Sequence, residues 1–447
     1  MPTPRDPQNI LETLLASARR EGADAADALL LENVSSSVSY RLGHLEDVER
    51  SESADLGLRV FIGKRVAFVS SSDFSDDAVK ALAGRALAMA RLAPEDKFAG
   101  LAPKEILARV IPALDLEDAA EPSAEALVAG ARDAEQAGLA VAGVTNSEGG
   151  GASYSRSAIA LATSTGFFGR YAGTSHSIGV AVLAGEGTGM ERDYDQASAR
   201  HASDLRSAEA IGKSAGEKAV RRLNPRKVKS QTVPVVFDPR EAGGLLGHFA
   251  SAISGASVAR GTSFLKDRMG TDIFAPHVTI MDDPHRIRGL RSKPFDGEGV
   301  ANARRALIDH GRLTSWLLDC ASARQLGLAS TGHAARGTGG PPMPSATNLY
   351  MEAGALSPHA LIADIKQGFY VTELMGMGVN GVTGDYSRGA AGFWIENGEI
   401  LYPVSEVTIA GNLKDMFRQL TQANDLEFRY GTNAPTCRIE GMTIAGS

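Results

Sequence analysis

The stretch 368–417 decides the fold of the second half of the chain: GFYVTELMGMGVNGVTGDYSRGAAGFWIENGEILYPVSEVTIAGNLKDMF. Asn397-Gly398 stands between two apolar-rich runs. An Asn-Gly pair in this setting predicts a two-residue hairpin, because both residues of the turn must adopt positive φ. Apolar residues then recur at helical spacing, so we expect a helix over 412–423 with Asn412 as its N-cap.

The loop from Gly376 to Gly381 formally matches G-x-G-x-x-G. A dinucleotide site needs a helix to begin at this point, so that its N–H groups meet the pyrophosphate. Here the glycines continue to Gly389 and strand-like residues follow. We therefore interpret the loop as a tight turn in which backbone packs on backbone.

Asp385, Tyr386 and Arg388 are the most conspicuous polar residues of this loop. One interpretation is substrate binding, since glycines allow a close approach and Arg388 could bind a carboxylate. The other interpretation is that Asp385 and Arg388 pair with each other and brace the loop. We keep all three as candidate substrate-binding residues.

The second half of the chain resembles the TldD/PmbA family, and more closely its PmbA (TldE) branch. Three segments carry the resemblance besides the run 371–416. They are LLGHFASAISGASVARGTSFLKD at 245–267, KPFDGEGV at 293–300 and PTCRIEGMTIAG at 435–446. The resemblance covers essentially the whole chain and is strongest after Asn224.

Composition favours an ordinary globular protein. The chain has 447 residues, 43% of them hydrophobic and 22% charged, with a formal net charge of −7. The acidic balance argues against a nucleic-acid partner. No apolar run approaches the roughly 18 residues of a membrane span, and the N-terminus does not resemble a signal peptide. Two widely separated cysteines suit a reducing compartment, so we expect a cytoplasmic protein.

The chain pattern predicts an α+β fold. We expect an N-terminal α/β region with antiparallel strands over 1–92 and a middle region with an antiparallel meander and helices over 93–223. A basic linker at 224–231 is then followed by a strand-rich C-terminal domain over 232–447, with a mostly antiparallel sheet around one core. Short strands are expected at 27–31, 37–42, 158–163 and 175–183.

The helix expected over 239–254 is the part of the chain that bears on zinc chemistry. In the TldD branch, the resemblance implies that this region carries H-E-x-x-x-H, with a cysteine near the C-terminus as third ligand. Such a set leaves one coordination position for a water that the metal acidifies. Here His248 is followed by Phe249, and Ile253 stands where the second histidine would be. Cys437, in a strand-like run, is the one candidate for the cysteine.

We therefore expect no catalytic residue, metal ligand or cofactor in this chain. His248 is kept only as a candidate substrate-binding residue. The resemblance implies that zinc sits in a TldD-type partner subunit, and that the pair forms a cytoplasmic metalloprotease acting on small unfolded peptides. This chain would then be inactive alone and would help to hold the extended peptide. An isolated chain is expected to be able to form a homodimer through the surface meant for its partner.

Two further hypotheses stay open. In the first, the chain is a stand-alone peptidase whose site is built from scattered residues such as His248, Cys320 and His333. No two of the nine histidines stand three to five residues apart, which speaks against a metal site of this kind. In the second, the chain is a non-enzymatic peptide-binding or regulatory module, as the family's association with DNA gyrase modulation suggests.

Overall fold

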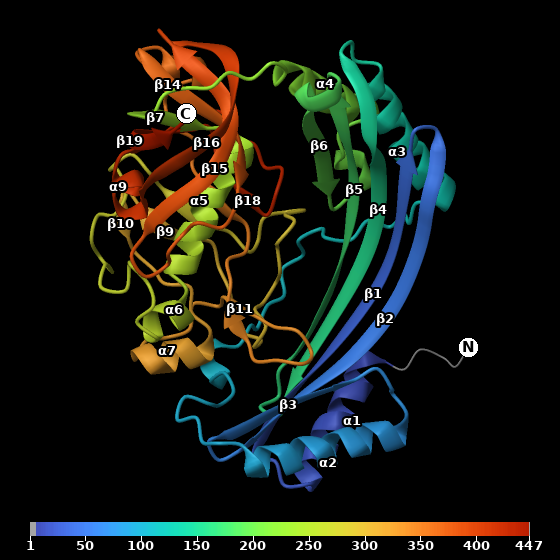
Figure 1. Ribbon diagram of the computed structural model, residues 1–447. Coiled ribbons are helices and arrows are strands. Elements are labelled where there is room, and N and C mark those ends of the chain that lie inside the picture. Colours follow the sequence, from blue (N-terminus) through green and yellow to red (C-terminus); the bar gives the residue numbers. More distant parts are fainter. Residues whose placement is uncertain (1–5, 447) are drawn as a thin grey trace.

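A computed structural model describes residues 6–446. The chain forms two halves, and a long curved sheet in the N-terminal half arches over the C-terminal half (Figure 1). This sheet is antiparallel throughout, with strand order β3-β2-β1-β4-β5-β6. Its strands are β1 (Ala25–Arg41), β2 (His44–Ile62), β3 (Arg65–Ser71), β4 (Val144–Thr163), β5 (Phe168–Ala184) and β6 (Glu191–Ala199).

Helices cover the two ends of this sheet (Figure 1). One pair packs on β1, β2 and β3, and its apolar residues share a core with those strands. The other pair packs on β4, β5 and β6. The first pair is α1 (Pro7–Arg20) and α2 (Asp76–Leu92), and the second is α3 (Ala124–Leu139) and α4 (Ala208–Arg221). Short 3-10 turns lie at Lys104–Ile106, Gly187–Gly189 and Ala202–Asp204.

A six-stranded sheet in the C-terminal half curls around one core. Its order is β16-β15-β14-β7-β19-β17, and an additional β16–β19 pairing closes five of the strands into a ring. All pairs are antiparallel except β14 with β7. Its strands are β7 (Gln231–Phe237), β14 (Gln367–Met375), β15 (Asp385–Glu396), β16 (Glu399–Asn412), β17 (Leu420–Gln422) and β19 (Cys437–Ala445).

Smaller elements complete this half. A second sheet has the order β10-β9-β8-β13-β18, and a short ribbon pairs β11 with β12. These strands are β8 (Ile280–Asp282), β9 (Arg305–Asp309), β10 (Arg312–Leu313), β11 (Ala334–Ala335), β12 (Met343–Pro344), β13 (Leu349–Met351) and β18 (Thr432–Asn433). The helices are α5 (Pro239–Ala252), α6 (Gly255–Ala259), α7 (Cys320–Leu326), α8 (Pro358–Ile362) and α9 (Leu413–Arg418).

The fold class predicted from the sequence is confirmed: it is α+β with antiparallel sheets. The hairpin at Asn397-Gly398 forms as expected, with φ of 50° and 81°. The loop after Gly376 leads into β15 and not into a helix. The domain boundaries stay a prediction, and strands from both 1–92 and 93–223 belong to a single sheet.

Several predicted element lengths are wrong. The short strands expected at 158–163 and 175–183 are parts of β4 and β5, which are 20 and 17 residues long. The short strands expected at 27–31 and 37–42 are one strand of 17 residues, β1, which pairs with neighbours on both sides. Its middle is polar and only partly buried, so the apolar pattern lapses while the backbone pairing continues. The helix expected over 412–423 is only six residues long, with Asn412 as N-cap. Leu420 continues the helical spacing of apolar residues, but it is buried in β17 and does not belong to the helix.

A buried network of four charged side chains joins the two halves. Arg59 on β2 donates to Asp27 on β1 (Nε–Oδ2 2.9 Å) and to Glu298 of the C-terminal half (Nη1–Oε1 3.3 Å). Arg336, also from the C-terminal half, donates to the other oxygen of Asp27 at 2.7 Å. All four side chains are at most 5% exposed. Burial would raise the pKa of Asp27, but the charges of Arg336 and Arg59 outweigh it and lower that pKa.

In residues 6–446, no helix is both long enough and apolar enough to cross a bilayer.

We expect an isosteric substitution in this network to destabilise the folded chain strongly. Asp27→Asn leaves two buried guanidinium groups facing one carboxylate, so we expect the free energy of unfolding near neutral pH to fall by about 3–5 kcal/mol. Urea unfolding followed by circular dichroism measures the change. The matched control is Asp47→Asn on the exposed part of β2, which should change stability by no more than about 0.5 kcal/mol. Equal effects of the two substitutions would contradict the role of the network.

Candidate functional site: a groove between the two halves

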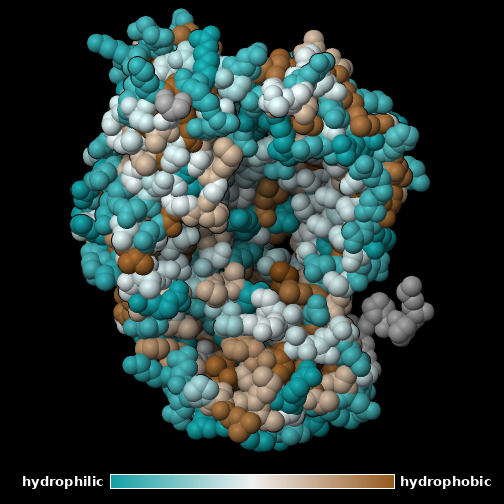
Figure 2. Space-filling view, viewed as in Figure 1, coloured by the Kyte–Doolittle hydropathy of each residue, from teal (hydrophilic) through white to brown (hydrophobic). Residues whose placement is uncertain are grey.

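A groove separates helix α5 from the curved sheet, and Figure 2 shows the molecule hollowed between its two halves. It consists of two cavities of ≈ 330 Å³ and ≈ 350 Å³ that share Arg291, Ser345 and Ala346. The first cavity follows α5, and the second reaches Ser157 on β4 and Tyr171 on β5. The two cavities therefore adjoin each other, and together they could hold an extended chain.

Helix α5 presents three different faces. One face is apolar and packs into the main core of the C-terminal half. A second face carries Glu241 and His248, which stand two turns apart and lie near Arg388 and Tyr386 of β15. The third face lines the groove with small residues, among them Gly247, Ala250 and Ser251. Such residues allow another backbone to approach the helix closely.

Three of the four candidate residues from the sequence meet beside α5. The ring of His248 lies edge-on to that of Tyr386, with centroids 6.0 Å apart. Burial lowers the pKa of His248, and the charge of Arg388 lowers it further. The Tyr386 hydroxyl is buried and has no hydrogen-bond partner within residues 6–446. None of these residues lines the two cavities, so their role in substrate binding stays a prediction.

Asp385 is separate from this group. Its carboxylate accepts hydrogen bonds from Thr383 (2.6 Å) and Asn412 (2.9 Å), while Arg388 donates from Nε to the carbonyl of Met375 (3.1 Å). The predicted pairing of Asp385 with Arg388 is wrong. The two residues are three apart on a strand, so their side chains leave β15 on opposite faces.

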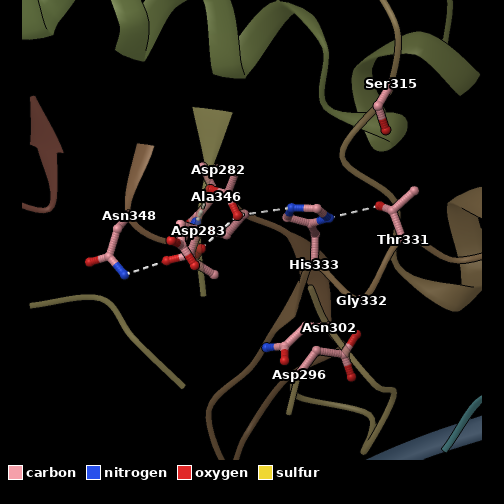
Figure 3. Close-up of polar contacts among 12 residues, drawn as sticks. Asp282, Asp283, Asp296, Asn302, Ser315, Thr331, Gly332, His333, Ala346 and Asn348 are labelled. Atoms are coloured by element: carbon pink, nitrogen blue, oxygen red, sulfur yellow. Dashed lines mark hydrogen bonds and ion pairs between the residues drawn. The ribbon is translucent and has the colours of Figure 1, made fainter. Parts of the chain in front are cut away.

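His333 belongs to a buried hydrogen-bond network (Figure 3). Its Nε2 lies 3.1 Å from Oδ2 of Asp282, and its Nδ1 lies 2.8 Å from the hydroxyl of Thr331. A ring protonated at Nε2 satisfies both contacts. The N–H and hydroxyl of Thr347 also donate to Asp282, at 2.6 and 2.5 Å. With both nitrogens engaged, His333 braces the fold.

This network positions one wall of the groove. The N–H of Ser345, a groove residue, donates to the carbonyl of His333 at 2.8 Å. Asn348 follows directly after Thr347, and its Oδ1 accepts the N–H of Arg291 at 2.9 Å. Asn348 is 2% exposed. The buried polar residues therefore fix the backbone at two groove residues that come from different loops.

The residues of the stand-alone hypothesis have different partners. Cys320 begins α7, its N–H donates to Glu298 at 2.8 Å, and burial raises the pKa of its thiol. His248 contacts Tyr386, and His333 contacts Asp282 and Thr331. Within the described part of the chain, no group of three or more His, Cys, Asp or Glu side chains is placed to hold a metal ion.

The donors expected from the TldD branch do not fit a zinc ion here. Ile253 is fully buried at the end of α5 and offers no ligand atom. Cys437 is also fully buried, 3.2 Å from the carbonyl of Pro435, and burial raises the pKa of its thiol. Since zinc is bound by the thiolate, this environment disfavours Cys437 as a ligand.

Sequence reasoning missed the charged residues of the groove, which are Arg200, Arg291 and Lys293. Arg200 follows β6, whereas the other two lie in the loop that leads to β9. Lys293 opens the family-like segment KPFDGEGV, and that resemblance was the one signal in the sequence that pointed to this loop. No spacing rule links residues that the fold brings together from such distant loops.

Glu241 makes the stability depend on pH. Burial raises its pKa from 4.5 to about 7, although Arg240, 3.9 Å away, opposes the shift. The folded chain therefore holds a proton that the unfolded chain releases, and stability falls as pH rises between these two values. We expect the free energy of unfolding of Glu241→Gln, relative to that of the native chain, to rise by up to about 3 kcal/mol between about pH 4 and about pH 8.

Urea unfolding of both proteins at the two pH values measures this gain. The control is Glu217→Gln on α4, where the side chain is 56% exposed and little pH-dependent gain is expected. A Glu241→Gln variant whose advantage stays constant with pH would contradict the burial of an ionisable group at this position.

Sequence models of the PmbA/TldA metallopeptidase family match the chain in three parts. Its domain 1 matches residues 26–90, its central domain 117–223 and its C-terminal domain 230–446. Metalloprotease PmbA of Escherichia coli O157:H7 is 43% identical over 434 residues, which are 97% of this chain and 94% of that protein. A PmbA homolog of Haemophilus influenzae is 38% identical, over 92% of this chain and 90% of that protein.

Solved structures agree with these matches. A proposed modulator of DNA gyrase from Bacteroides thetaiotaomicron superposes with a TM-score of 0.91 at 26% identity, over 98% of this chain and 99% of that one. TldE from Thermococcus kodakarensis superposes with a TM-score of 0.87 at 22% identity, over 97% and 99% of the two chains, and shows the shared fold. The chain therefore belongs to the PmbA/TldD metallopeptidase family, within its PmbA branch.

Proposed function

We propose that this chain is the peptide-holding, non-zinc subunit of a two-component cytoplasmic metallopeptidase that acts on small unfolded peptides. A TldD-type partner supplies the zinc and the glutamate base. The observation that carries the proposal is the combination found on α5. The helix borders a groove in a metallopeptidase fold, yet within residues 6–446 no group of donor side chains is placed to hold a metal.

The groove suits an unfolded peptide more than a folded protein. Its α5 side is lined by glycine, alanine and serine, which make room for a second backbone and select little by side chain. An extended peptide can be held through its backbone groups, a mode that tolerates many sequences. In this proposal the groove presents the peptide to the zinc site of the partner.

The proposal predicts activity only in the mixture. The purified chain alone should contain far less than stoichiometric zinc and cleave no peptide, because it lacks the ligand set. Adding a TldD-type subunit from the same organism should produce zinc-dependent cleavage of short unstructured peptides. Zinc analysis by mass spectrometry and peptide cleavage followed by chromatography measure both properties.

Two variants separate the hypotheses. Replacing the glutamate of H-E-x-x-x-H in the partner by glutamine should abolish cleavage, whereas His248→Ala in this chain should leave the zinc content of the mixture unchanged. Stoichiometric zinc with cleavage by this chain alone would overturn the proposal in favour of a stand-alone peptidase. A partner that cleaves equally well without this chain would favour a regulatory module.

A further inference from the structure

The charged residues that line the groove are all cations. They are Arg200, Arg291 and Lys293, and no aspartate or glutamate lines either cavity. This contrasts with the formal net charge of −7 for the whole chain. A concave site of one sign, set in a protein of the opposite net charge, raises the local concentration of an oppositely charged ligand.

Within residues 6–446, none of these three cations lies within 4 Å of a carboxylate oxygen. Arg200 donates to three backbone carbonyls, those of Thr174 (3.0 Å), Gly289 (3.3 Å) and Leu290 (2.5 Å). Burial lowers its pKa, as expected for a desolvated cation without a paired acid. Lys293 donates to the carbonyl of Ala334 (3.0 Å). The carboxylates of Asp296 and Asp282 act on the charge of Lys293 and partly compensate it. Buried cations in proteins are normally paired, and the cations of the groove without such a carboxylate partner among the described residues are Arg200 and Arg291.

Arg291 is the exposed cation of the three, and its backbone is fixed. Asn348 accepts its N–H, and its side chain crosses Gly431, where an added Cβ would collide with it. No hydrogen bond holds its guanidinium within the described residues. The hydroxyl of Tyr171, on the opposite wall of the same cavity, likewise has no partner there, while its ring is held edge-on by Phe295 at 5.4 Å.

We propose that this part of the groove binds a carboxylate of the extended peptide, with Arg291 as the forked donor, Tyr171 donating from the opposite wall and the charge of Arg200 behind them. The inference rests on the proposed function, because it takes a peptide as the ligand. An arginine fork matches the geometry of a carboxylate. The carboxylate belongs either to the C-terminus of the peptide or to an Asp or Glu side chain.

Calorimetric titration of the full chain with unlabelled peptides tests this directly. The peptides share one Ala/Ser sequence and are a neutral free acid, a neutral C-terminal amide, an amide with internal Glu and an amide with internal Lys. We expect at least one carboxylate-bearing peptide to bind about tenfold more tightly than the neutral and Lys-containing amides. A preference for the free acid assigns the site to the peptide C-terminus, and a preference for internal Glu assigns it to acidic side chains.

Arg291→Glu should remove this preference without disturbing the fold, since the side chain is exposed and makes no hydrogen bond. Gly431→Ala should weaken binding in the same sense by displacing Arg291. The matched control is Arg268→Glu, an exposed arginine outside the groove that carries the same charge change. Equal affinity for all peptides, no measurable binding of any of them, or equal effects of the two Arg→Glu changes would overturn the inference.

Failure of the carboxylate site and failure of the proposed function give different results in these experiments. Carboxylate-selective binding by the chain alone, together with no cleavage after adding the partner, would retain the site and reject the two-component peptidase. Cleavage by the mixture that is insensitive to peptide carboxylates and to Arg291→Glu would retain the peptidase and reject the site.

Discussion

Two arginines and two carboxylates, buried where the halves of the chain meet, hold the groove in shape. Asp27 and Arg59 come from neighbouring strands of the curved sheet, and Glu298 and Arg336 come from the C-terminal half. Charges removed from water are costly unless each is paired, so the network tolerates little displacement of one half against the other. The groove walls belong to different halves, and their separation therefore depends on these contacts.

A second buried polar network fixes the positions of single residues in the groove walls. Asp282, His333 and Thr347 fix the loop that carries Ser345 and Ala346, and Asn348 fixes the backbone of Arg291. Asp282 and His333 thus position one wall of the groove. This gives His333, which chemistry alone would favour as a catalytic residue, a structural role.

Local sequence signals predicted much of the fold. The capping residue Asn412 and the turn residues Asn397-Gly398 act within a few positions and form as expected. Strand length was less predictable, because the polar middle of β1 is held by pairing on both sides and not by an apolar face. The length of that strand depends on interactions between distant segments, and these leave no periodic pattern in the sequence.

The candidate site was predictable only in part. One helix and one strand bring together His248, Tyr386 and Arg388. By contrast, irregular loops carry Arg200 and Arg291 to the groove. The prediction that this chain binds no zinc rests on residue spacing, since ligands on one helix must recur at helical intervals, and it stays a prediction. The groove itself depends on how the two halves pack, which no local pattern encodes.

The most direct test of this account is to locate the peptide in the assembled two-component enzyme. A photo-crosslinking amino acid placed at Ser251 on α5, and separately at Ser157 on β4, should each capture a substrate peptide, because both positions line the groove. The same group at Glu217, which is exposed on α4 and does not line the groove, should capture none. Crosslinks at Glu217 without any at Ser251 or Ser157 would contradict the claim that the groove holds the peptide.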